Sequence, residues 1–180
     1  TEFQVTASAP MAGPYDLSQL ITYVFKQETF PSGAYIAFLL NAYNTIYKWD
    51  RLDDIFNSPY SETIPELFDG SMTFSEIDNQ LPSDISLLLK ESFINDYLAD
   101  KETEIKEVMA ENTLLNWKPN APIRFFHGDA DQIVPYFNAT NIVSSLREAG
   151  GAEIDLITIN DGNHETAGTP CILGMIEWIN

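Results

Sequence analysis

The sequence of 180 residues is poor in cysteine, in basic side chains and in long apolar runs. Its single cysteine, Cys171, excludes an internal disulfide and a cysteine-based metal cluster. Only 9 lysines and arginines stand against 27 aspartates and glutamates, which gives a net charge of -18. Because so acidic a protein repels phosphate backbones and anionic lipid, we expect no nucleic-acid partner and no membrane-surface role. No apolar run approaches the roughly 18 residues of a membrane span, so we expect none.

The first residues, TEFQVTASAP, carry no initiator methionine, no basic segment and no apolar leader segment. We interpret this start as the result of a removed leader, or of a natural N-terminus that lies further upstream.

What the sequence does have is enough apolar material for a sizeable core, since 44% of its residues are hydrophobic. Residues 3–9 read as a buried strand, and a helix is expected over 17–25 with Asp16 or Ser18 as its cap. From about residue 28 to 116 glycine and proline become sparse and apolar residues recur at helical spacing. This middle block is therefore predicted to be all helical.

The C-terminal part alternates between strand and helix after a turn-rich boundary at 117–122. Strands are predicted over 123–127 and 153–159, with a helix over 136–149 between them. Two strands joined by a crossover helix imply a parallel pair that helices cover. A last helix begins near Pro170, and its residues expected to point inward are Ile172, Leu173, Ile176 and Ile179.

Charged side chains follow both of these strands directly. Asp129 and Asp131 come after the first strand, and His164 comes after the second. In open parallel sheets the sites lie at the carboxyl ends of the strands, so Asp131 and His164 are expected to be neighbours. A buried carboxylate next to a histidine fixes the tautomer of a general base, which is two-thirds of a nucleophilic triad. Alternatively, Asp131 caps the following helix and His164 is an ordinary loop histidine.

The same segments resemble the motifs of one family. HGDADQIVP, residues 127–135, resembles the HGxxDxxVP segment of α/β hydrolases, and GNHETAG, residues 162–168, resembles their histidine loop. APMAGPYDLS, residues 9–18, resembles the segment after strand six in the secreted lipase and esterase branch. The resemblance implies that Asp131 is the triad acid and His164 the general base. It implies an ester or lipid substrate, no cofactor and no metal, whereas His127 is expected to support the loop by hydrogen bonding.

The fold implied by the resemblance is α/β, a partial α/β-hydrolase fold with an insertion. The last three strands of the sheet and their flanking helices would come from residues 1–27 and 117–180. Residues 28–116 would form an inserted all-helical lid. The family resemblance also places the protein outside the cell or in the periplasm.

The departure from the family pattern concerns the nucleophile. In α/β hydrolases it lies in a G-x-S-x-G elbow upstream of strand six, and no glycine of this sequence opens such a pentapeptide. We therefore expect the C-terminal portion of a serine esterase or lipase that is inactive alone. Its exposed apolar surface would bind the missing N-terminal half or a second copy. The alternative is a non-catalytic binding or interaction module on a degenerate hydrolase scaffold.

Overall fold

The computed structural model describes residues 4–151 and 153–180, and it divides the chain into two compact units. One unit comprises Thr1–Ile21 with Val108–Asn180, and the other comprises Thr22–Glu107. Helices α1 (Leu17–Val24) and α8 (Thr103–Glu111) cross the two boundaries. No helix in the described part of the chain is both long and apolar enough to cross a membrane.

The first unit is built on two parallel strands, β1 (Ile123–Gly128) and β2 (Ile154–Ile159), in the predicted order. Helix α9 (Phe137–Glu148) forms the crossover between them, as predicted. It ends at Glu148, and Gly150, two residues later, has a φ of 91° in the left-handed region that glycine tolerates. In the register, Ile123 lies opposite Ile154, so both strands end at the same edge of the sheet.

The N-terminal segment pairs with the other side of β1, but it is not the regular strand predicted for residues 3–9. Ser8 and Met11 form isolated parallel bridges with Ile123 and Phe126, and residues 1–3 lie outside the described residues. Pro10 has no N–H to donate, although its carbonyl accepts the Phe126 N–H at 3.0 Å. A proline inside the segment therefore breaks the ladder into single bridges, and the pairing begins later than predicted.

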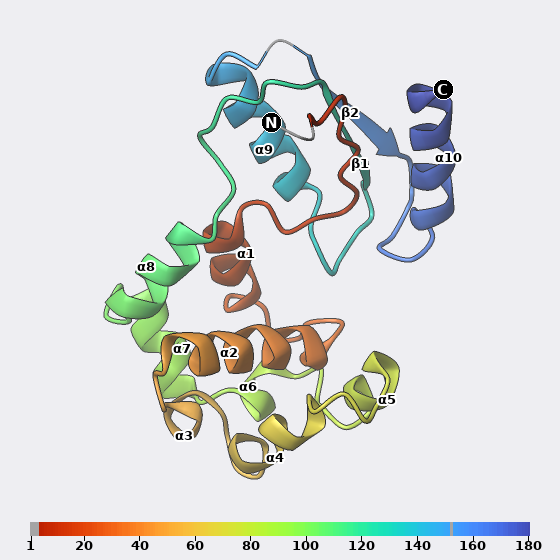
Figure 1. Ribbon diagram of the computed structural model, residues 1–180. Helices are drawn as coiled ribbons and strands as arrows, with labels where there is room; N and C mark the ends of the chain where they lie inside the picture. Colours follow the sequence, from red (N-terminus) through yellow and green to blue (C-terminus); the bar gives the residue numbers. More distant parts are fainter. Residues whose placement is uncertain (1–3, 152) are drawn as a thin grey trace. The chain divides into compact units, whose positions relative to one another are not determined.

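Helices cover both faces of this sheet, with α9 on one side and α10 (Gly168–Ile179) on the other (Figure 1). Phe125 packs on the α9 face with Ile142 and Leu146. Phe126 packs on the α10 face with Cys171 and Met175.

The prediction of which face of α10 points inward is wrong. Ile172, Leu173, Ile176 and Ile179 are between 46% and 61% exposed. This helix is apolar almost all round, so the spacing of its apolar residues cannot select a face. The inward face is the one that fits the sheet, because a Cβ at Gly174 would lie only 2.8 Å from the Phe126 ring.

The second unit is helical throughout the middle block, as predicted, with only two isolated antiparallel bridges besides. Its apolar core includes Ile85, Leu88, Leu89, Phe93 and Tyr97, which are at most 2% exposed. The predicted capping box of Thr73 and Glu76 is present at the start of α5. The helices between α1 and α8 are α2 (Gly33–Tyr47), α3 (Leu52–Ile55), α4 (Tyr60–Leu67), α5 (Phe74–Asp78), α6 (Ile85–Leu88) and α7 (Glu91–Leu98).

The chain segments that lead into and out of the second unit are tied together within the first. The Leu114 N–H donates to the Tyr15 carbonyl at 2.8 Å, and the Ser18 N–H donates to the Thr113 hydroxyl at 3.2 Å. Asp16 accepts from the Gln19 N–H at 3.2 Å, which confirms it as the cap of α1.

Candidate catalytic site at the carboxyl end of the sheet

Two glycines let the loops after β1 and β2 approach each other closely. A Cβ at Gly128 would lie 2.0 Å from the carbonyl oxygen of Gly162, so no larger residue fits there. The Ala130 N–H donates to that same carbonyl at 3.1 Å. Asp129 binds the two loops further, because its Oδ1 accepts the Asp161 N–H at 2.7 Å. Asp129 thus helps to hold the two loops together.

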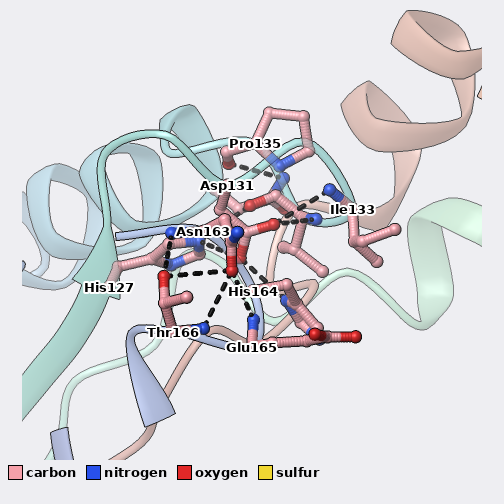
Figure 2. A network of polar contacts seen from close by, with 10 residues as sticks. His127, Asp131, Ile133, Pro135, Asn163, His164, Glu165 and Thr166 are labelled. Atoms are coloured by element: carbon pink, nitrogen blue, oxygen red, sulfur yellow. Dashed lines mark hydrogen bonds and ion pairs between the residues drawn. The ribbon is translucent and has the colours of Figure 1, made fainter. Parts of the chain in front are cut away.

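Asp131 lies at the centre of the resulting polar network, and its side chain is completely buried (Figure 2). Its Oδ1 accepts the N–H groups of Ile133 and Val134, both at 2.9 Å. Its Oδ2 lies 2.8 Å from Nδ1 of His164 and 3.4 Å from Nε2 of His127. One carboxylate oxygen therefore fixes the backbone of the loop, and the other faces the two histidines.

The interpretation of Asp131 as a cap of the following helix is wrong for α9. The N-cap of α9 is Tyr136, which makes no side-chain cap hydrogen bond. Asp131 instead stabilises the turn that precedes this helix through the N–H groups of residues 133 and 134.

His164 lies where the sequence predicts it, next to the buried acid. Its Nδ1 is within the 2.6–3.2 Å range of a strong hydrogen bond to Asp131. An ionised carboxylate can only accept, so Nδ1 carries the proton and Nε2 is the basic nitrogen of the neutral ring. The side chain is 27% exposed, so the ring is accessible to a reacting group.

Charge and hydrogen bonding shift the pKa values of this pair apart. Burial raises the pKa of the Asp131 carboxyl, but hydrogen bonds from His127, His164 and the Val134 N–H, with the charge of His164, hold that pKa well below its ordinary value. The hydrogen bond to Asp131 raises the pKa of His164 against the opposing effect of burial, and the Asp131 charge adds to it. The arrangement favours an ionised acid next to a strengthened base.

Asn163 holds the backbone of the histidine loop, a role that the sequence reasoning missed. Its Oδ1 accepts the N–H groups of Glu165 at 3.0 Å and Thr166 at 2.8 Å. Its own N–H donates to the Thr166 hydroxyl at 2.9 Å. An asparagine followed three residues later by a threonine, just after a strand, is the signal that could have indicated this reciprocal turn.

The described residues contain no group of three or more His, Cys, Asp or Glu side chains that could hold a metal ion. A histidine held by a buried carboxylate is an arrangement that can transfer protons.

Comparison with known proteins identifies the family and similar folds. A family model described as secretory lipase matches residues 83–180. The fold is similar to that of a protein from Legionella pneumophila that is provisionally described as a hydrolase, at 26% identity and a TM-score of 0.87. It is also similar to the rice cell wall degrading esterase LipA from Xanthomonas oryzae, at 24% identity and a TM-score of 0.78. Candida antarctica lipase A in its closed state has 18% identity and a TM-score of 0.72.

The similarity extends over nearly the whole of this chain but over only part of the others. The chain is covered to 97%, 99% and 98%, whereas the three structures are covered to 47%, 49% and 40%. The chain thus spans about half the length of the first two. No curated protein matches the sequence.

Proposed function

Because the chain belongs to the secretory lipase family, we propose that it supplies the acid and the base of a serine carboxylic-ester hydrolase. The observation that carries the proposal is the 2.8 Å contact between Nδ1 of His164 and a carboxylate that is completely buried. In a Ser-His-Asp triad the acid has this place, because it fixes the tautomer of the base.

The proposed reaction uses the two ring nitrogens of His164 differently. Nε2 takes the proton of a serine hydroxyl as the oxygen attacks the ester carbonyl, and Asp131 stabilises the imidazolium that forms. The same proton then passes to the leaving alcohol, which leaves an acyl-enzyme. In the second half, Nε2 takes a proton from water as the water oxygen attacks the acyl carbon, and returns it to the serine.

The serine is proposed to come from outside these 180 residues, since none of their glycines opens a G-x-S-x-G pentapeptide. The chain by itself would then hold an oriented base with nothing to activate, and would be inactive.

The substrate class, the lid and the compartment are part of the same proposal. We propose an ester or lipid substrate, an inserted lid over residues 28–116, and a place outside the cell or in the periplasm. The secretory lipase family supports the substrate class and the export. Exposed aromatic side chains on the helical unit, at Tyr35, Phe38 and Phe74, support a surface that contacts apolar substrate.

A non-catalytic binding module is the second candidate function, and the missing nucleophile motif is what favours it. In that case the acid and histidine would be kept only as loop structure. The whole protein that carries this chain would then be as inactive as the chain alone.

Hydrolysis of p-nitrophenyl butyrate by the protein that carries this chain with its nucleophile tests the proposal. His164→Gln and Asp131→Asn should each abolish nearly all activity. Asp129→Asn is the matched control, because an amide oxygen can still accept the Asp161 N–H. Full activity in either of the first two variants would contradict the proposal.

The isolated chain is tested with the same ester. It should not exceed a heat-treated control. A burst of product that a serine-directed phosphonate abolishes would show that the nucleophile lies within the chain.

A further inference from the structure

We propose that His127 is a positioning residue for the triad acid, and that its Nε2–H holds Oδ2 of Asp131 in place for His164. This inference rests on the proposed function, since it concerns how the same site works.

The hydrogen bonds of His127 decide which of its nitrogens carries the proton. Nε2 lies 2.7 Å from the carbonyl oxygen of Val134 and 3.4 Å from Oδ2 of Asp131. A carbonyl oxygen can only accept, so Nε2 must donate. The single N–H is shared, with the stronger share on Val134 and the weaker one on Asp131.

The ring of His127 cannot easily turn away from this pair. It is completely buried at the end of β1, with its residue paired opposite Thr158. The Tyr136 ring packs edge-on against it, with centroids 5.8 Å apart and planes at 89°. The Tyr136 hydroxyl is itself tied to the Thr158 hydroxyl at 2.5 Å. Nδ1 of His127 is buried without a partner among the described residues, so the ring orientation is set from the Nε2 side.

The two histidines of the chain therefore have opposite tautomers in the neutral state, and both N–H groups meet on one oxygen. His164 donates from Nδ1 and His127 from Nε2, while Oδ1 is held by two backbone N–H groups. Without His127, His164 would be the only side chain in the described part of the protein that holds Oδ2. That is the ring whose position the acid has to define, so a second, fully buried donor gives the acid an orientation independent of the base.

The test uses three substitutions in the complete, active protein. His127→Phe keeps a ring against Tyr136 but removes the donor, whereas His127→Gln keeps an N–H close to the Nε2 position. Val143→Ala is the matched control, because it removes buried volume from the α9 core and makes none of the site's hydrogen bonds. The measurements are kcat, KM and the acid limb of the kcat/KM profile, which reports the base in the free enzyme.

The expected result is a fall in kcat on the order of tenfold in His127→Phe with KM unchanged, the size typical of a lost orienting partner. Its acid limb should move to lower pH, because a less well placed carboxylate raises the pKa of His164 less. His127→Gln should recover most of both effects, and Val143→Ala should leave the acid limb in place.

Three results would overturn the inference. His127→Phe could match the parent protein, His127→Gln could be as impaired as His127→Phe, or the acid limb could move to higher pH. If His127→Phe does not fold, His127→Asn replaces it, since its amide reaches only the Nδ1 position. Failure here is distinct from failure of the proposed function, in which His164→Gln and Asp131→Asn would themselves stay active.

Discussion

Replacing Asp131 by asparagine changes a single oxygen into an NH₂ group, and the site amplifies this change. The amide oxygen can still accept the N–H groups of Ile133 and Val134, so the loop backbone keeps its partners. The NH₂ group, however, faces Nδ1–H of His164 and Nε2–H of His127, and both are donors. His164 can relieve the conflict by moving its proton to Nε2, which removes the basic nitrogen that catalysis needs. For a triad, this exchange of tautomer lowers kcat by about 10⁴-fold.

The second conflict has no such relief. His127 cannot give up its Nε2 proton without leaving the Val134 carbonyl, which lies 2.7 Å away. The amide N–H of the new asparagine that faces His127 therefore stays unpaired and buried, which costs about 1–3 kcal/mol of unfolding free energy. Initial rates of the complete protein, which includes the nucleophile, with p-nitrophenyl butyrate measure the first effect, and urea unfolding of the same preparation measures the second. A variant that keeps kcat within tenfold of the parent, or that loses stability alone, would refute the argument from tautomers.

Three further predictions follow from the loops, the charges and the exposed helix face. Gly128→Ala should destabilise the protein by about 1–3 kcal/mol or more in urea unfolding, because its Cβ would meet the Gly162 carbonyl at 2.0 Å. Gly168→Ala, with open space around it, should not; equal effects would remove the argument. The stability lost in Asp131→Asn should be largest between about pH 4 and 6.5. Above the pKa that Asp131 has in the unfolded chain, the lowered pKa of its folded state stabilises the protein, and this stabilisation is lost as pH falls. Below the pKa that His164 has in the unfolded chain, the raised pKa of its folded state stabilises the protein, and this stabilisation is lost as pH rises. A difference in unfolding free energy that is flat from pH 3 to 8 would contradict this. The exposed apolar residues of α10 should cause self-association or binding to another polypeptide, so light scattering should not find a stable species of 20.3 kDa.

The site could be predicted to a large extent because strand ends are encoded locally. β1 ends at Gly128 and charged residues follow it, and a polar loop that contains Asp161 and His164 follows β2. With the parallel rule, these short patterns were enough to bring Asp131 and His164 together. The separate partners of the two Asp131 oxygens, backbone N–H groups for Oδ1 and the histidines for Oδ2, were not predictable. They depend on the exact placement of Ile133, Val134 and His127.

The predictions that failed concern features that depend on packing between residues far apart in the sequence. The inward face of α10 is decided by the packing of the Phe126 ring against Gly174. The sequence of an evenly apolar helix does not indicate which of its faces packs inward. The pairing of residues 8–12 depends on where Pro10 leaves a gap in the ladder with a strand far along the chain. The roles of Asn163 and His127 come from hydrogen bonds that composition and spacing do not specify.

The ties between Tyr15 and Leu114, and between Ser18 and Thr113, also bear on how the chain folds. They join segments on either side of the whole second unit, Thr22–Glu107. If that segment were unfolded, each contact between residues 8–12 and β1 would form only at the cost of the entropy of closing a long loop. The second unit is continuous in sequence and has its own buried core, so we expect its collapse to bring its two ends closer before the sheet forms. We therefore expect the pairing of the N-terminal segment with β1 to be a late folding event, with a rate that depends on helices outside the sheet.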